Sequence, residues 1–357
     1  MPTAFPARLM PRFASRIIKR CTARPPRATA SAAVLATVLA VALPVGFAGP
    51  AAAAISSPAC QAAAQASDGN LSTYNTTNGV ADLGLGMAPG TSPAITAVPG
   101  GSFEEAFQAN TGVLWEDSAS GAVDTGQGMA AGTSPVIAGL ADGGFEVAFQ
   151  ANTGALIVYG TGGDINTDLG MMPGTNPAIL AFSNGGFEVA FEANTGVLWY
   201  YSTSSGGVDT GQGMAAGTSP SIAPVAGTGT NFEIAFQANN GGLILYGNAD
   251  NITTGIAMEP GTSPSLYMPP LGSTPVVAYV SASDYLYTYV PTVGAEKWLA
   301  IAAGSSPSIT PLPNMTSLYG YEIAYESTAG QLWLSGTYAG IDTGLDMAGS
   351  TGTAIIC

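Results

Sequence analysis

Residues 187–199 read Phe-Glu-Val-Ala-Phe-Glu-Ala-Asn-Thr-Gly-Val-Leu-Trp, and the chain repeats this stretch with small changes. Similar words stand at residues 103–115, 145–154, 232–241 and 321–333. A turn of the Gly-Thr-Ser-Pro type precedes the repeats and begins at Gly90, Gly132, Gly174, Gly217, Gly261 and Gly304. These glycines are 42, 42, 43, 44 and 43 residues apart. A constant period of about 40–45 residues with strand-like content is typical of the blades of a β-propeller.

Each repeat is expected to hold four short strands. In the copy quoted above we predict them near residues 178–182, 187–193, 197–202 and 208–214. Within the second strand Phe187, Val189 and Phe191 recur with period two, which places them on one face of the sheet. Gly196 suits the positive φ of a three-residue hairpin. No apolar stripe of helical period lasts three turns, so helix is disfavoured.

The two ends of the chain each carry part of a repeat. Cys60 aligns with Phe103 at the start of a second strand, and residues 352–357 supply a lone first strand after the last complete unit. We therefore predict that one blade is shared between the termini, which gives seven blades of four strands. Pairing the last strand with the first closes the ring and removes two exposed edges.

Two cysteines fall on this shared blade. By alignment Cys60 and Cys357 occupy the positions of Phe103 and Ala97, which are expected to face each other across a hairpin. In an exported chain such a pair is usually oxidised. We predict a disulfide Cys60–Cys357 that locks the ring, with two free thiols as the alternative.

Residues 1–54 differ from the rest of the sequence. They hold seven of the eight basic residues, then an apolar run over about 32–48, then Ala52-Ala53-Ala54. This order is typical of a secretory signal peptide, and we predict cleavage after Ala54. The alternative is an uncleaved anchor, because the apolar run is only slightly shorter than a membrane span. Residues 55–357 are then a secreted, extracellular, all-β propeller.

Removal of the leader leaves a strongly acidic domain. Only Lys297 remains against 23 carboxylates, a formal charge of −22. Phosphate and anionic-lipid binding depend on Lys and Arg, so nucleic-acid and membrane partners are not expected.

Short words in several units carry a family resemblance. They are Asn-Thr-Gly-Val-Leu-Trp at 110–115 and 194–199, Ala-Gly-Gln-Leu-Trp at 329–333 and Ser-Asp-Gly-Asn-Leu at 67–71. They resemble the Asp-Gly-x-Leu-Trp words of tachylectin-like and tectonin-like propeller lectins, and the repeat modules appended to secreted bacterial hydrolases. The resemblance implies carbohydrate binding in shallow pockets between neighbouring blades, once per repeat or nearly so.

Three sets of side chains are candidate ligand contacts. Tryptophans close the third-strand word in three units, and an aromatic face can stack on a pyranose ring, although packing between blades is the alternative: Trp115, Trp199 and Trp333. Amide and acid side chains recur at the end of the second strand: Gln108, Gln150, Glu192 and Gln237. The irregular sixth unit adds Tyr287 and Trp298 beside Lys297, where drift of a blade released from binding is the alternative.

A glutamate recurs at one position of the second strand: Glu104, Glu146, Glu188, Glu233 and Glu322. Three interpretations stay open. The carboxylates accept hydrogen bonds from the next blade, as buried acids must. They bind Ca²⁺, which prefers clustered oxygen ligands. Or they contact sugar hydroxyls.

Catalysis is not expected. Histidine is absent, which removes Ser-His-Asp hydrolysis and His-ligated zinc. No arginine follows residue 27, whereas a sialidase needs an arginine cluster for its substrate carboxylate. Glycoside hydrolysis needs two carboxylates in different environments, and equivalent glutamates offer the opposite. We predict no catalytic residue, cofactor or metal, and a lectin-like protein that binds neutral carbohydrate or a cell-surface glycan. The alternative is an extracellular structural or adhesive module that binds protein.

Overall fold

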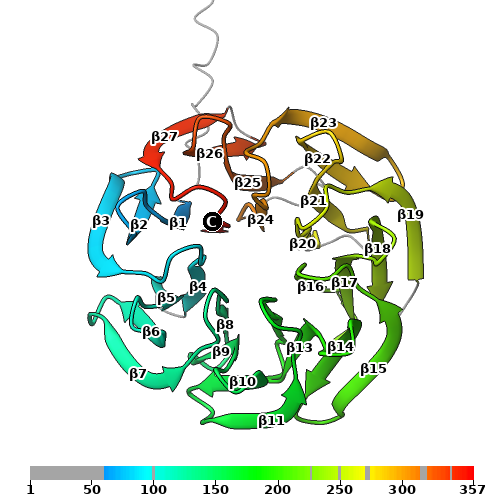
Figure 1. Cartoon of the computed structure of the whole chain (residues 1–357), viewed down its shortest axis with the longest axis horizontal. Coiled ribbons are helices and arrows are strands. Elements are labelled where there is room, and N and C mark those ends of the chain that lie inside the picture. Colours follow the sequence, from blue (N-terminus) through cyan, green and yellow to red (C-terminus); the bar gives the residue numbers. More distant parts are fainter. Residues whose placement is uncertain are drawn as a thin grey trace, which may run out of the picture. The chain divides into compact units, whose positions relative to one another are not determined.

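The computed structural model describes residues 60–98, 101–225, 227–247, 251–269, 274–313, 320–337 and 340–357. These residues form seven four-stranded antiparallel sheets, arranged as the blades of a ring (Figure 1). The predicted signal peptide, residues 1–54, lies outside the described residues. Within the described ranges, no helix is long and apolar enough to cross a membrane.

We number the blades from the one that holds both chain ends and give their strands from the inside outward. Blade 1 contains β28 (Ala354–Ile356), β1 (Gln61–Gln65), β2 (Asn70–Asn75) and β3 (Gly79–Gly86). Blade 2 contains β4 (Ala94–Val98), β5 (Ser102–Gln108), β6 (Val113–Ser118) and β7 (Val123–Gly128). Blade 3 contains β8 (Val136–Gly139), β9 (Phe145–Gln150), β10 (Ala155–Gly160) and β11 (Ile165–Gly170). Blade 4 contains β12 (Ala178–Ala181), β13 (Phe187–Glu192), β14 (Val197–Ser202) and β15 (Gly206–Gly213).

The other three blades follow the same order. Blade 5 contains β16 (Ser221–Pro224), β17 (Phe232–Gln237), β18 (Gly242–Gly247) and β19 (Asn251–Ala257). Blade 6 contains β20 (Ser265–Tyr267), β21 (Val276–Val280), β22 (Tyr285–Val290) and β23 (Gly294–Ala300). Blade 7 contains β24 (Ser308–Pro311), β25 (Tyr321–Glu326), β26 (Gln331–Gly336) and β27 (Ile341–Asp346). Each outermost strand lies on the rim of the ring (Figure 1).

The chain ends close the ring as predicted. β28 pairs antiparallel with β1, with Ala62 opposite Ile355, so the last strand of the chain is the innermost strand of the first blade. The disulfide Cys60–Cys357 is present beside this pairing. In blade 2 Ala97 lies opposite Phe103, which confirms the alignment from which the disulfide was predicted.

The strands of blade 4 also agree with the prediction. β14 has the predicted bounds, β12 and β13 each end one residue earlier than predicted, and β15 begins at Gly206, two residues earlier. Gly196 has a φ of 76° in the turn between β13 and β14, where a glycine was expected.

The hydrophobic core lies in the seams between neighbouring blades. Phe187, Val189 and Phe191 of blade 4 share one face of β13 and pack with Leu156 and Val158 of blade 3. Equivalent clusters fill the other seams. Each blade therefore buries one face against the blade before it and the other face against the blade after it.

A belt of hydrogen bonds surrounds the centre of the ring. The backbone N–H of the residue before each turn proline donates to the equivalent side chain of the next blade: from Ser92 to Ser134 (2.8 Å), Ser134 to Asn176 (2.7 Å), Asn176 to Ser219 (3.0 Å), Ser219 to Ser263 (2.9 Å) and Ser263 to Ser306 (3.0 Å). In blade 1 the N–H of Gly352 donates to Ser92 (2.7 Å). Gly352 has no side chain to accept the bond that would complete the belt.

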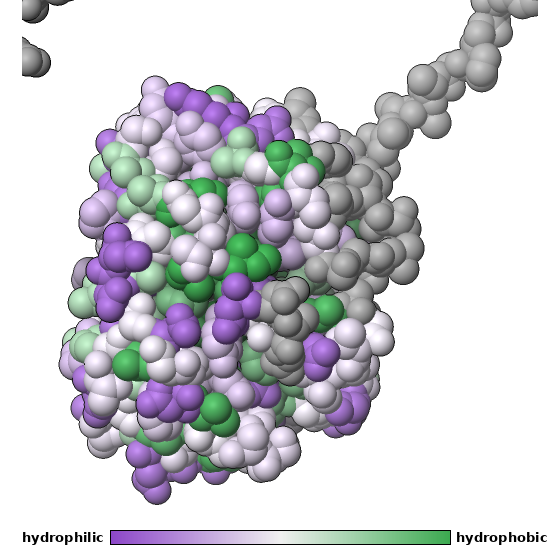
Figure 2. All heavy atoms as spheres, turned by 90° about the vertical axis from the view of Figure 1, so that its right-hand side faces the viewer, coloured by the Kyte–Doolittle hydropathy of each residue, from purple (hydrophilic) through white to green (hydrophobic). Residues whose placement is uncertain are grey.

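Figure 2 shows the outer side of the ring that lies on the right of Figure 1, where β19 and β23 form the rim. Hydrophilic and hydrophobic residues are intermingled over the coloured part of this face, and the hydrophobic ones stand in small groups. Val293 and Leu299 of blade 6 are among the large apolar side chains that are exposed.

Candidate functional site

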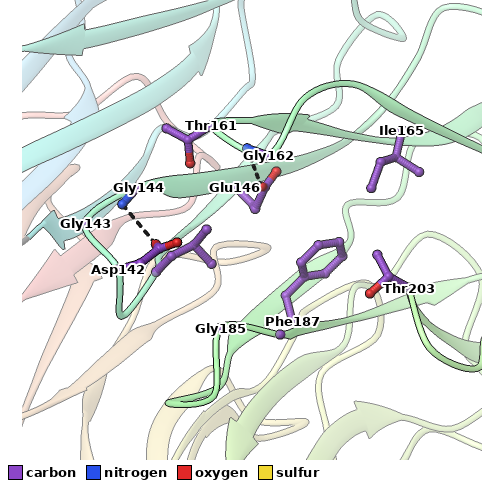
Figure 3. Close-up of a pocket in the computed structure, with 12 residues that line it drawn as sticks. Asp142, Gly143, Gly144, Glu146, Thr161, Gly162, Ile165, Gly185, Phe187 and Thr203 are labelled. Carbon is purple, nitrogen blue, oxygen red and sulfur yellow. Dashed lines mark hydrogen bonds between the residues drawn. The ribbon is translucent and has the colours of Figure 1, made fainter.

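Two cavities open in successive seams, on the face of the ring that carries the loops joining first to second and third to fourth strands. The cavity between blades 3 and 4 has a volume of about 500 Å³ and is lined in part by Asp142, Glu146, Thr161, Phe187 and Thr203 (Figure 3). The cavity between blades 4 and 5 has a volume of about 480 Å³. Its lining includes Glu188, Tyr200, Ser202 and Phe232. Both volumes fall in the range of small-ligand sites.

In the first cavity a glutamate is held by the loop beside it. The backbone N–H of Gly162 donates to Oε1 of Glu146 at 3.0 Å (Figure 3). A Cβ at Gly160 would lie 2.8 Å from the other carboxylate oxygen, so glycine at the end of β10 makes room for this side chain. Burial raises the pKa of Glu146, the Gly162 N–H lowers it and the negative charge of Asp142 raises it further. Phe187 from blade 4 presents its ring on the opposite wall (Figure 3).

The second cavity is built on the same plan with two changes. Ser202 stands where blade 3 has Gly160, and Tyr200 stands where blade 3 has Val158. Glu188 is 6% exposed, and its Oε1 has no hydrogen-bond partner among the described residues. Burial raises the pKa of Glu188 to about 7. The rings of Tyr200 and Phe232 meet edge to face, with centroids 5.2 Å apart, across the seam.

The amide side chains at the ends of the second strands are buried away from both cavities. Gln108 and Gln150 are 0% and 1% exposed, and each donates to a backbone carbonyl of the next blade, Ala130 O at 2.9 Å and Met172 O at 3.1 Å. Each also accepts a bond from a turn glycine of that blade. Gln237 donates to Glu259 O at 2.9 Å. These contacts give the amides a role in joining neighbouring blades, and their contact with a ligand remains a prediction.

Glu192 takes the same position in blade 4 without the amide nitrogen. It is 0% exposed, and within the described part of the chain neither carboxyl oxygen has a well-formed hydrogen bond. Burial raises the pKa of Glu192 to about 7, and the nearby backbone N–H of Gly217 offsets part of that effect.

The three tryptophans of the third strands are half-buried in seams. Trp115 packs on the cluster between blades 1 and 2, Trp199 on the one between blades 3 and 4, and Trp333 on the one between blades 6 and 7. The indole N–H groups of Trp115 and Trp199 are buried and have no hydrogen-bond partner among the residues that the structure describes. Trp199 is not among the residues that line the two cavities. Its position favours packing, and its contact with a sugar remains a prediction.

Tyr287 and Trp298 of blade 6 belong to different seams. Tyr287 lies opposite Lys297 in the β22–β23 pairing, so the adjacent Trp298 faces the other way. Tyr287 stacks on Tyr279 at 5.7 Å in the seam with blade 5. Trp298 donates from Nε1 to Thr288 Oγ1 at 2.9 Å and packs against Tyr321 of blade 7. The structure does not bring these two residues into one patch.

Blade 2 holds an acidic group that sequence reasoning did not single out. Glu105 and Glu116 lie on opposite faces of the blade and are 4% and 9% exposed. Burial raises the pKa of each to about 7, and the charge of Glu104 adds to both. Gln61 of blade 1 donates to Glu105 at 3.0 Å. Among the described residues, no three acidic or cysteine side chains come together as ligands for a metal ion.

A third cavity, of about 380 Å³, lies at the centre of the ring. It is lined by the uncharged starts of the seven inner strands, of which Ser92-Pro93-Ala94-Ile95 in blade 2 is representative.

Sequence comparisons return no matching family model and no similar curated protein. Solved structures share the fold. A lectin of Burkholderia pseudomallei, BP39L, has 13% identity and a TM-score of 0.58, covering 80% of this chain and 96% of its own. AofleA of Arthrobotrys oligospora has 13% identity and a TM-score of 0.51, covering 76% of this chain and 90% of its own.

The lectin SapL1, solved in complex with α-methyl fucoside, has 14% identity and a TM-score of 0.52, covering 73% of this chain and 96% of its own. The chain is thus similar to propeller lectins in fold. The residues that line its cavities are its own, since identity at this level carries no correspondence of sites.

The cavities use side chains that the sequence did not mark as contacts. Phe187 and Phe232 open the repeated word, and period two placed such residues in the core. Tyr200 is the only aromatic residue at its position of the repeat among the seven blades, and this is a signal that could have distinguished the seam between blades 4 and 5.

Proposed function

We propose that this chain is a secreted, non-catalytic carbohydrate-binding propeller whose sites are the cavities between neighbouring blades. The observation that supports this most is the recurrence of one arrangement in two successive seams. Each cavity combines an aromatic ring, a buried carboxyl group and hydroxyl-bearing side chains. Aromatic rings match the apolar face of a pyranose, and carboxyl and hydroxyl groups match its hydroxyls. The fold shared with lectins such as BP39L supports the same function.

The presence of two equivalent cavities allows multivalent binding. Two shallow sites on one rigid ring bind a surface that displays many copies of a glycan, and the second contact is made at high effective concentration. A weak single site is therefore sufficient for firm attachment to such a surface.

A glycan array tests the proposal, with one variant designed to block the cavities. Thr203 is exposed and lines both cavities, so Thr203→Trp fills them without entering the core. We expect binding to at least one glycan, lost in Thr203→Trp with an unchanged melting temperature. The control is Thr195→Trp, which places the same side chain in the exposed turn at the opposite end of β14 and leaves binding intact. An array without any bound glycan contradicts the proposal, and favours the protein-binding alternative.

A further inference from the structure

The two cavities on either side of blade 4 are adjoining. Gly185, Gly186, Phe187 and Thr203 line both of them. Gly185, with a φ of 87°, and Gly186 form the tip of the hairpin that separates the cavities, and neither has a side chain to raise the ridge between them. A ligand that fills one cavity can therefore continue over the glycines into the other.

The linings carry acidic groups and no basic one. Asp142 and Glu146 line the first cavity and Glu188 lines the second. The only basic residue after residue 54 is Lys297, which lies over the ring of Tyr285 at 3.2 Å in blade 6. A cleft lined by one sign of charge concentrates ligands of the opposite sign.

Glu188 points to a ligand independently of that charge pattern. In blade 3 the equivalent Glu146 accepts a hydrogen bond from Gly162 N–H. In blade 4 the loop after β14 begins with Thr203 and Ser204. Glu188 is 6% exposed, and its Oε1 has no hydrogen-bond partner among the described residues, as is also the case for Oε2 of Glu146. A buried carboxyl group that lacks a donor is costly unless a bound partner supplies one.

The aromatic walls restrict the chemistry of that partner. Tyr200 and Phe232 face each other in the second cavity, and Phe187 contributes to both. A protonated amine is attracted both to a carboxylate and to an aromatic face, and a pyranose ring supplies the apolar surface that packs on the rest of the wall.

Resting on the proposed function, we propose that the two cavities beside blade 4 form one acidic groove for a linear oligosaccharide whose sugars carry protonated amines. Glu188 is the residue that recognises an amine in this groove, and the glycine ridge lets consecutive sugars occupy both cavities.

The test is calorimetric titration of the full chain at pH 7, near the pKa of about 7 that burial gives Glu188, with two hexasaccharides of equal length, β-1,4-linked glucosamine and its fully N-acetylated form. Acetylation removes the charge and keeps the ring. We expect the glucosamine hexamer to bind at least about tenfold more tightly, because charge-assisted hydrogen bonds are about twice as strong as neutral ones. Glu188→Gln keeps the shape of the side chain and should weaken binding of the glucosamine hexamer about tenfold or more.

A matched variant separates recognition from general charge. Glu296→Gln makes the same substitution at an exposed site of β23 in blade 6 and should leave the affinity unchanged. Circular dichroism checks that each variant is folded. If Glu188→Gln does not fold, Thr203→Trp provides a second variant in which the groove is blocked. Equal binding of the two hexamers, or equal effects of Glu188→Gln and Glu296→Gln, overturns the inference.

The outcome also distinguishes this inference from the proposed function. Binding of a neutral glycan on the array without any preference for the amine-bearing hexamer retains the proposed function and rejects the acidic groove. Absence of binding to every glycan and to both hexamers rejects both.

Discussion

Replacement of Glu192 by Gln should stabilise the protein at neutral pH. Glu192 lies in the seam between blades 4 and 5, fully buried, and neither oxygen has a well-formed hydrogen bond among the described residues. Four other blades have glutamine at this position and use its amide to join the next blade, as Gln108 does with Ala130 O at 2.9 Å. Glu192→Gln supplies the missing donor at nearly the same volume.

The magnitude follows from the pKa of the carboxyl group. In the folded protein it is raised from the ordinary value of 4.5 to about 7, with burial as the main cause. Between these pH values the folded protein keeps a proton that the unfolded chain has lost, so the free energy of unfolding falls as the pH rises. At about 1.4 kcal/mol per pH unit, this costs the wild type up to about 3 kcal/mol above pH 7 and nothing below pH 4.5.

Urea denaturation monitored by tryptophan fluorescence from pH 4 to pH 8 measures this effect. The stability difference between Glu192→Gln and the wild type should grow by about 1–3 kcal/mol across that range, the upper value being the linkage limit. Glu296→Gln, at an exposed position, should change the stability by less than about 0.5 kcal/mol at every pH. A difference for Glu192→Gln that does not vary with pH would refute the reasoning, because the carboxyl group would then titrate alike in both states.

Three further predictions concern the closure of the ring, the central belt and the acids of blade 2. Replacing Cys60 and Cys357 together by serine removes a cross-link between residues 297 positions apart and should lower the free energy of unfolding by about 2–5 kcal/mol, measured by urea denaturation; an unchanged midpoint would mean that β28 holds the ring without the disulfide. Ser134→Ala removes the acceptor for Ser92 N–H and should cost about 1 kcal/mol, whereas Ser120→Ala in an exposed loop of blade 2 should cost less than about 0.5 kcal/mol. Glu116→Gln removes a buried acid whose pKa is raised to about 7, so it should raise the thermal midpoint at pH 8 and leave it nearly unchanged at pH 4; the same shift at both pH values would contradict the account.

The repeat made the architecture predictable from the sequence. Period-two alternation in residues 187–193 identified the face of β13 that packs on blade 3, and the alignment of Cys60 with Phe103 identified the shared blade and its disulfide. These features depend on local pattern and on equivalence between repeats, both of which a single sequence displays.

The sites depend on contacts that the sequence does not display. Glu146 and Glu188 occupy the same position of the repeat, but Glu146 accepts a hydrogen bond from Gly162 N–H, whereas Oε1 of Glu188 has no partner among the described residues. Tyr287 and Trp298 looked like one patch, but a register shift in the β22–β23 pairing accompanies their placement on opposite faces of blade 6. Cross-strand register and the loop that follows the adjacent strand determine where these side chains lie and which hydrogen bonds they make.

A crystal structure of the protein with its best glycan from the array tests the central claim most directly. The account predicts electron density for the sugar in the seams between blades 3 and 4 or 4 and 5, against Phe187 or Phe232 and within hydrogen-bond distance of Glu146 or Glu188. Density only in the central cavity beside Ser92-Pro93, or only on the outer rim, would contradict it.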